Sequence, residues 1–250
     1  MILSLTELMT TTSPKIISII TATWNDGNYL SECVNSVLAQ SYRDWEWIIV
    51  NNGSSDNTEE ILSQISDSRI TIINLKENAG VSSGRNLALE RANGSFICFL
   101  DGDDILPENS ISARVKVFDK DQDIGFVDGK VLTFQGSVEN VTSEYIPDFR
   151  GLPMDSLLSL DGSVFMGNTW MIRVEKPVKM RFENKLTHGE ELLFYIRAMN
   201  GCKYDFTDEP VLHYRKHGTS AMSNIQGQRD SFVKIIAELR TIKKVTNNQI

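Results

Sequence analysis

Residues 15–23 read KIISIITAT, and this short run of β-branched and apolar residues decides the fold because its pattern returns three times. A run of this length and composition predicts a buried strand rather than a helix. The pattern is repeated by WEWIIV at 45–50, RITIINL at 69–75 and SFICFL at 95–100. The first hundred residues therefore predict four buried strands.

Helical patterns separate these predicted strands. Residues 28–41 carry apolar side chains at helical spacing, and residues 80–93 predict another helix. Between them, Ser55 or Asp56 can cap a helix that runs to about Ile65. Buried strands that alternate with helices predict an α/β fold, with a mostly parallel, doubly wound sheet flanked by helices.

Each predicted strand is followed by a polar loop. These loops read ATWND, NNGSSD, KENAGVSSGRN and DGDD in chain order. Ligands of doubly wound sheets bind outside the carboxyl ends of the strands. We therefore expect the four loops to share one rim and to form the site.

The pattern becomes less regular after about Leu106, and we expect one domain over residues 1–250. Its parts would be a first half at about 15–106, a second half at about 107–220 and an amphipathic helix at about 229–245. The predicted elements of the second half are strand material at 124–134 and 162–174, a loop at 143–153, a helix at 187–202 closed by Gly201, and a strand with a loop at 211–223.

The composition narrows the class of protein. The formal net charge of −8 provides no basic footprint for nucleic acid. The three cysteines are odd in number and match no zinc pattern, which favours a reducing, cytoplasmic setting. No apolar run approaches the ~18 residues of a membrane span, so we expect a soluble protein and leave a peripheral membrane contact open. The N-terminal segment is a poor signal peptide.

The acidic run Asp101-Gly102-Asp103-Asp104 has two readings on its own residues. Magnesium takes one or two carboxylates together with substrate phosphates, and Gly102 would let the backbone bend and a ligand approach. The alternative is an acidic turn that ends a strand. A phosphatase of the haloacid dehalogenase type is a weak third reading, because Ile105 stands where Thr or Val is needed. The position on the shared rim favours the metal site, held by Asp101 and Asp103, with Asp104 supporting the turn.

A resemblance to a known family strengthens this interpretation. The segments SIITATWNDGNYLSECVNSVLAQSYRDWEWIIVNNGSSDNT, NAGVSSGRNLALERANGSFICFLDGDD and HGEELLFYIRA resemble, in this order, the family-2 glycosyltransferases. These are inverting enzymes with the A-type glycosyltransferase fold. The resemblance runs from about Ile16 to His217. The motifs up to about Leu106 are specific to the family, and the resemblance is looser beyond that residue. In the later part the chain is similar to enzymes that build capsular or cell-surface polysaccharides.

The resemblance implies a metal and nucleotide site. Asp101 and Asp103 would hold Mn²⁺ or Mg²⁺ against the donor diphosphate. The family's Thr-Tyr-Asn is here Thr23-Trp24-Asn25, and this loop would line the nucleoside. Trp24 would stack on the donor or else pack into the core.

The second loop departs from the family. Its usual Asp-Asp-Gly or Asp-Asn-Gly is here Asn51-Asn52-Gly53, so an amide replaces the expected carboxylate. An amide can still accept and donate hydrogen bonds, although the charge-assisted bond is lost. We expect Asn51 to contact the base with an altered preference. The alternative is that Asn51 and Asn52 only form a tight turn.

Two basic residues complete the implied donor site. Arg85 lies where the family has Ala-Arg-Asn, near a helix N-terminus that suits a phosphate, or is an ordinary solvated arginine. Some relatives use a histidine near His217 as a further metal ligand, and a solvated histidine is the alternative.

Trp170 and Arg173 would face the acceptor, although core packing explains Trp170 equally well.

The family places a Glu-Asp pair at the start of a helix, and this chain has Glu190-Glu191. An inverting transfer needs a base for the acceptor hydroxyl, and Glu191 stands at the expected position, with Glu190 as the second choice. Two carboxylates in a cleft raise each other's pKa, although acidic residues also favour first helical turns without any function.

The resemblance thus implies a metal-dependent inverting glycosyltransferase. It would move a sugar from a nucleotide-sugar donor, most simply a UDP-sugar, to a saccharide or lipid-linked saccharide acceptor. The alternative is an inactive nucleotide- or glycan-binding protein of the same fold, favoured by Asn51 and Glu191 and opposed by the intact Asp101-Gly102-Asp103.

Overall fold

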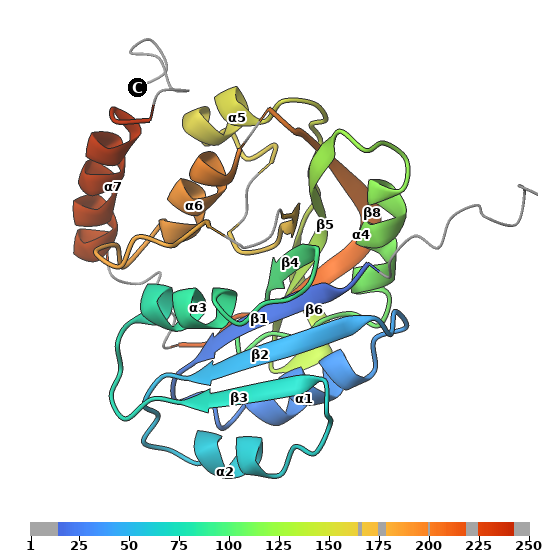
Figure 1. The fold of residues 1–250 in the computed structure, drawn as a ribbon, viewed down its shortest axis with the longest axis vertical. Helices are drawn as coiled ribbons and strands as arrows, with labels where there is room; N and C mark the ends of the chain where they lie inside the picture. Colours follow the sequence, from blue (N-terminus) through green and yellow to red (C-terminus); the bar gives the residue numbers. More distant parts are fainter. Residues whose placement is uncertain (1–14, 165–166, 175–178, 200, 219–224, 243–250) are drawn as a thin grey trace, which may run out of the picture.

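The computed structural model describes residues 15–164, 167–174, 179–199, 201–218 and 225–242. One eight-stranded sheet runs through this part of the chain (Figure 1). The strands are β1 (Ile17–Thr23), β2 (Trp45–Asn51), β3 (Ile70–Asn74), β4 (Phe96–Phe99), β5 (Ile124–Gln135), β6 (Ser137–Tyr145), β7 (Met171–Arg173) and β8 (Lys203–Arg215). The helices are α1 (Leu30–Leu38), α2 (Thr58–Ser63), α3 (Val81–Leu89), α4 (Ser110–Phe118), α5 (Met154–Ser159), α6 (Glu190–Ala198) and α7 (Ile225–Leu239).

The strand order is β3-β2-β1-β4-β7-β5-β6, and β8 pairs with β5 on its other side. The pairs β1–β2, β1–β4, β2–β3 and β5–β8 are parallel, whereas β4–β7, β5–β6 and β5–β7 are antiparallel. The four strands predicted from the first hundred residues thus form the parallel part. The second half adds the antiparallel strands, so the sheet as a whole is mixed.

Helices cover both faces of the sheet, as the doubly wound prediction requires. One apolar cluster joins α1, α2 and α4 to the sheet through residues such as Val37, Leu62 and Ile111. A second cluster joins α3, α6 and α7 to the opposite face. Side chains alternate between the two faces along β1, where Ile19 belongs to the first cluster and Ile20 to the second.

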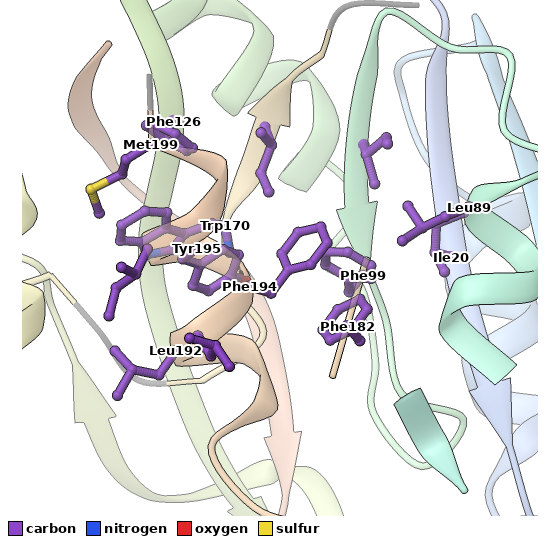
Figure 2. Packing of buried hydrophobic residues seen from close by; sticks show 14 of the residues in the cluster. Ile20, Leu89, Phe99, Phe126, Trp170, Phe182, Leu192, Phe194, Tyr195 and Met199 are labelled. Atoms are coloured by element: carbon purple, nitrogen blue, oxygen red, sulfur yellow. Dashed lines mark hydrogen bonds between the residues drawn. The ribbon is translucent and has the colours of Figure 1, made fainter. Parts of the chain in front are cut away.

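Aromatic packing fixes α6 against the sheet (Figure 2). Phe99 of β4 contacts the rings of Phe182 and Phe194 edge-on, at centroid distances of 5.1 and 5.4 Å. Trp170 stacks on Tyr195 at 4.5 Å. Offset and edge-on aromatic pairs stabilise beyond their buried area, so the first turn of α6 is held at a defined place beside the end of β4.

Several predicted boundaries were wrong. Neither Ser55 nor Asp56 is the N-cap of α2, which follows Asn57, although Asp56 Oδ1 accepts a hydrogen bond from the Thr58 amide at 3.0 Å. Helix α6 ends at Ala198, before Gly201, because Met199 adopts an extended conformation and packs into the core.

Further differences lie in the second half. Among the described residues of 162–174, only Met171–Arg173 form a strand; residues 165–166 lie outside the described residues. Gly162 and Gly167 have positive φ values, which interrupt an extended backbone. The predicted loop at 143–153 begins as the end of β6. Helix α7 starts at Ile225, before the predicted start at 229, and ends at Leu239. The last part of the predicted helix, 243–245, lies outside the described residues.

Candidate active site

Arg85 lies at the centre of the site and joins three carboxylates from two parts of the chain. Its guanidinium donates from Nη2 to Asp101 Oδ1 at 2.8 Å, and from Nη1 to Glu191 Oε1 at 3.0 Å and Glu190 Oε1 at 3.3 Å. Arg85 comes from α3, Asp101 lies two residues after the end of β4, and the two glutamates open α6. The Arg85 side chain is only 3% exposed. The predicted donor carboxylate and the predicted bases therefore meet on one buried cation.

The two glutamates differ in environment. The side chain of Glu190 is 7% exposed and that of Glu191 is 17% exposed. Burial, followed by the charge of Glu191, raises the pKa of Glu190 to about 7, although Arg85 opposes both effects. Glu190 thus titrates near neutrality, and Glu191 is the more accessible carboxylate of the pair.

Asp103 and His217 form a second group on the same rim. His217 Nε2 lies 2.8 Å from Asp103 Oδ2, and the ring of Tyr29 stacks on the imidazole at a centroid distance of 5.1 Å. Burial, followed by the charge of Asp101, raises the pKa of Asp103, and the contact with His217 opposes this. His217 is thus held at the acidic run rather than free in solvent.

Asp104 is buried under this rim. Its Oδ1 accepts from the Arg215 backbone amide at 2.8 Å, and Arg215 Nε donates to the Asp103 carbonyl oxygen at 2.7 Å. Arg215 Nη2 also donates to Glu32 at 2.9 Å. These bonds tie the acidic turn to the end of β8, which agrees with the supporting role expected for Asp104.

The space beside Gly102 is filled by the first loop. A Cβ at this position would lie 2.6 Å from Asp26 Oδ2 and 2.8 Å from Thr23 Oγ1. Asp26 occupies the side of Gly102 on which a Cβ would lie, so only glycine fits there. The approach of a ligand to the Gly102 backbone stays a prediction. Thr23 Oγ1 donates to Asp26 Oδ2 at 2.7 Å, and burial raises the pKa of Asp26 to about 6.

Asp26 has no predicted role, although it belongs to the ATWND loop expected on the rim. Its neighbour Trp24 is 51% exposed, so the core-packing alternative for Trp24 was wrong. Asn25 has a positive φ of 58°, and its Oδ1 accepts from the Ser55 amide at 2.8 Å. This bond holds the first and second loops together.

The two asparagines of the second loop bind protein groups. Asn51 Oδ1 accepts from the Ser54 amide at 3.1 Å, and its Nδ2 donates to Asn74 Oδ1 at 3.1 Å. Asn52 accepts from the Ala79 amide and donates to Asn78, both at 3.0 Å. Both side chains shape the turn, as the alternative interpretation held, and both residues are only 2% exposed.

The donor set fits part of a divalent cation site. The described residues contain no group of three or more His, Cys, Asp or Glu side chains arranged to hold a metal ion. Asp103 and His217 do present an oxygen and a nitrogen donor 2.8 Å apart on the rim. Because Mg²⁺ and related ions complete their shells with waters and substrate phosphates, these two groups fit a site that the donor diphosphate would finish.

Two predicted acceptor contacts do not lie at the rim. Trp170 is fully buried against Tyr195 and Phe126, so the core-packing alternative is the right one. Arg173 pairs with Phe96 at the start of β4, the end of the strand away from Asp101, and its Nε donates to the Ile124 carbonyl oxygen. Neither side chain belongs to the site.

The chain belongs to glycosyl transferase family 2, whose model it matches over residues 18–179. It is similar to the putative teichuronic acid biosynthesis glycosyltransferase TuaG of Bacillus subtilis, with 46% identity over 103 residues that cover 40% of this chain and 41% of TuaG. It is also similar to the UDP-Glc:alpha-D-GlcNAc-diphosphoundecaprenol beta-1,3-glucosyltransferase WfgD of Escherichia coli, with 37% identity over 46% of this chain and 45% of WfgD. These matches span less than half of either relative.

Solved structures confirm the A-type glycosyltransferase fold. The mannosyltransferase PcManGT from Pyrobaculum calidifontis, in complex with GDP-Man and Mn²⁺, superposes with a TM-score of 0.68 at 16% identity. The superposition covers 94% of this chain and 67% of PcManGT. The chain is therefore a glycosyltransferase by its family, and its fold is the one that this family uses. No helix among the described residues is long and apolar enough to cross a bilayer.

Proposed function

We propose that this glycosyltransferase moves a sugar, with inversion, from a nucleotide-sugar donor to a saccharide acceptor in the synthesis of a polysaccharide or glycoconjugate. A UDP-sugar is the preferred donor, as in the name of WfgD, and the acceptor is a saccharide or a lipid-linked saccharide. The reaction depends on Mn²⁺ or Mg²⁺. The three free cysteines support the reducing, cytoplasmic setting expected from the sequence.

The bridge made by Arg85 carries this proposal. It brings Asp101, on the side of the donor, within reach of the same guanidinium as Glu190 and Glu191. A displacement at an anomeric carbon needs the leaving group and the base on opposite sides of one sugar, and therefore near each other. The ends of β4 and α6 supply these two groups.

Glu191 is the proposed base because it is the more exposed carboxylate of the pair. It takes the proton of the acceptor hydroxyl as that oxygen attacks the anomeric carbon. The bond between the anomeric carbon and the diphosphate oxygen breaks in the same step, and the nucleoside diphosphate leaves with the electron pair. Glu190, which is less exposed, tunes the charge beside Glu191.

The other rim residues bind the donor. Asp103 and His217, with Asp101 once Arg85 yields it, would hold the divalent ion, which supplies charge neutralisation for the departing diphosphate. Trp24 is exposed on the first loop and would stack on the nucleoside, beside Thr23 and Asn25. Asn51, with Asn52 beside it, would contact the base.

The test measures nucleoside diphosphate release and product formation with a panel of nucleotide sugars, acceptors and Mn²⁺. We expect Glu191→Gln to lower transfer by roughly 10²–10⁴-fold, the usual contribution of a general base, while donor binding persists. Glu59→Gln is the matched control, because Glu59 is an exposed carboxylate in the first turn of α2. It should stay close to wild type.

Two results would contradict the proposal. Full transfer by Glu191→Gln would remove the base from this position. Nucleotide binding without release, across all donors and acceptors, would favour the inactive binding protein instead. Thermal-shift measurements with UDP, dTDP, GDP and CDP, each with and without Mn²⁺, separate these cases from a failure of the donor site.

A further inference from the structure

Helix α7 has a buried face and an outer face of unusual character. Ser231, Ile235 and Leu239 are buried against the molecule. On the other side Phe232, Val233 and Ile236 are 38%, 64% and 42% exposed. Figure 1 shows α7 at the periphery beside α6, with its outer side turned away from the rest of the chain.

Basic residues share this outer face. Arg229, Val233, Ile236 and Arg240 follow one another at spacings of four, three and four, which places them along one stripe of a helix. Arg229 and Arg240 are exposed. We call Arg229, Phe232, Val233, Ile236 and Arg240 the outer stripe of α7.

The acidic residues of α7 lie off this stripe. Asp230 accepts a hydrogen bond from Gln226 at 2.8 Å, and Glu238 pairs with Arg197 of α6 at 2.7 Å. The outer stripe thus carries positive charge and apolar side chains, although the whole chain has a net charge of −8. Attraction to an anionic surface would therefore be local to this stripe.

The buried face of α7 contacts the loop that positions the proposed base. Ser231 Oγ lies 3.3 Å from Thr187 Oγ1, and it accepts a hydrogen bond from the Thr187 amide at 3.4 Å. A Cβ on Gly189 would lie 2.9 Å from Ile235 Cδ1, and Gly189 directly precedes Glu190. The outer stripe is consequently about one helix diameter, on the order of 10 Å, from the loop that opens α6.

We propose that the outer stripe of α7 docks on the surface of an anionic lipid bilayer. Its three apolar side chains would enter the boundary between headgroups and acyl chains, and its two arginines would bind lipid phosphates while their stems cover apolar surface. The biological sense of this contact rests on the proposed function, since a bilayer would present a lipid-linked acceptor beside Glu191. WfgD is named for a diphosphoundecaprenol acceptor of this chemical class.

A second copy of the chain fits the stripe less well. In a symmetric dimer the same patch meets itself, so two pairs of arginines would share one interface. The stripe contains no carboxylate to compensate them. An anionic bilayer supplies both the apolar layer and the phosphates.

The test is co-sedimentation of the full chain with vesicles of phosphatidylcholine alone or of phosphatidylcholine mixed with anionic phosphatidylglycerol. We expect binding to the anionic vesicles only. Arg229→Gln/Arg240→Gln should weaken it roughly tenfold or more, because each basic residue near an anionic surface contributes about a fivefold factor. Phe232→Ser/Val233→Ser/Ile236→Ser should abolish it.

Matched controls make the same changes elsewhere. Lys116→Gln/Lys120→Gln removes two exposed charges on the opposite face of the sheet, and Val141→Ser removes an apolar side chain that is 46% exposed on β6. Both should bind vesicles as the wild type does. Release of nucleoside diphosphate without membranes should be unchanged in every variant, so a failure of docking is distinguishable from a failure of the proposed function.

Three results would overturn the inference. The first is a wild-type chain that binds no anionic vesicle at low ionic strength. The second is equal binding by the stripe variants and the controls. The third is a wild-type dimer, seen by analytical ultracentrifugation, that dissociates in the apolar stripe variant, which would assign the stripe to a protein interface.

Discussion

Replacing Arg85 with glutamine tests the centre of the site. The change leaves three carboxylates without their shared cation, and they differ in how well water can replace it. The side chain of Asp101 is 38% exposed and that of Glu191 is 17% exposed, so both can be partly hydrated. The side chain of Glu190 is only 7% exposed, so water cannot hydrate its charge in the same way. Removing one partner of a buried ion pair typically costs about 3–5 kcal/mol.

Protonation of Glu190 relieves part of this loss. Its pKa is about 7 in the presence of Arg85, well above the ordinary glutamate value of 4.5, and it rises further when Arg85 is gone. A carboxyl with a raised folded-state pKa stabilises fully at low pH and loses this contribution as the pH rises through that pKa. The free energy of unfolding of Arg85→Gln should therefore fall by about 2–4 kcal/mol at pH 8 and by clearly less at pH 6.

Chemical denaturation at the two pH values, followed by tryptophan fluorescence, measures this difference. The acidic limb of the pH–rate profile for nucleoside diphosphate release should also move to higher pH in Arg85→Gln. Arg91→Gln changes an exposed arginine just after α3 and should alter neither quantity. The double variant Arg85→Gln/Glu190→Gln should recover stability at pH 8. An equal loss at pH 6 and pH 8, with no recovery in the double variant, would refute the reasoning.

Three further perturbations test other parts of the fold and site. Asp128 is fully buried and has a pKa of about 6 against an ordinary 3.8, so its ionisation opposes folding above pH 6. Asp128→Asn should therefore raise the free energy of unfolding by up to about 3 kcal/mol at pH 7.5 and leave it unchanged at pH 4. The same change at both pH values would exclude ionisation of Asp128 as the cause. Gly102→Ala should lower the free energy of unfolding by about 1–3 kcal/mol, because the new Cβ meets Asp26. This loss should be smaller in an Asp26→Ala background, and an unchanged loss would show that the strain does not come from Asp26. His217→Ala should raise the Mn²⁺ concentration that half-activates donor cleavage, since even indirect partners of a metal contribute roughly 10–100-fold to its affinity; an unchanged requirement would remove His217 from the metal site.

The sequence predicted the parallel strands β1, β2 and β4 well because they are buried on both faces, whereas the predicted burial of β3 was wrong, since β3 lies at the edge of the sheet and is partly exposed. All residues of β1 except Ala22 are buried, and such continuous apolar runs are easy to recognise. The antiparallel strand β6 was missed because it lies largely in solvent, and its sequence SVENVTSEY has no apolar face. Helix α4 was missed for the opposite reason. It is buried almost all round, so it shows no helical stripe.

The sequence did not predict how the candidate site residues are connected. The motifs placed Asp101 and Arg85 in loops on one rim and the glutamate pair at the start of a helix in the second half. Arg85 nevertheless binds residues 16, 105 and 106 positions away, and nothing in local spacing shows that three carboxylates share it. The phosphate contact expected for Arg85 assumed an open guanidinium, whereas packing around α6 has closed it.

The asparagines of the rim have a consequence for how quickly a donor can enter. Asn25 joins the loop after β1 to the loop after β2, and Asn52 joins the latter to the segment after β3. Asn51 joins the end of β2 to the end of β3. Three loops that would otherwise move independently are cross-linked before any ligand arrives. Little ordering entropy then remains to oppose association, since the chain has lost it on folding. The binding of the nucleotide by these loops should therefore proceed in a single kinetic phase. A slower step, if present, should come only from the separation of Asp101 from Arg85.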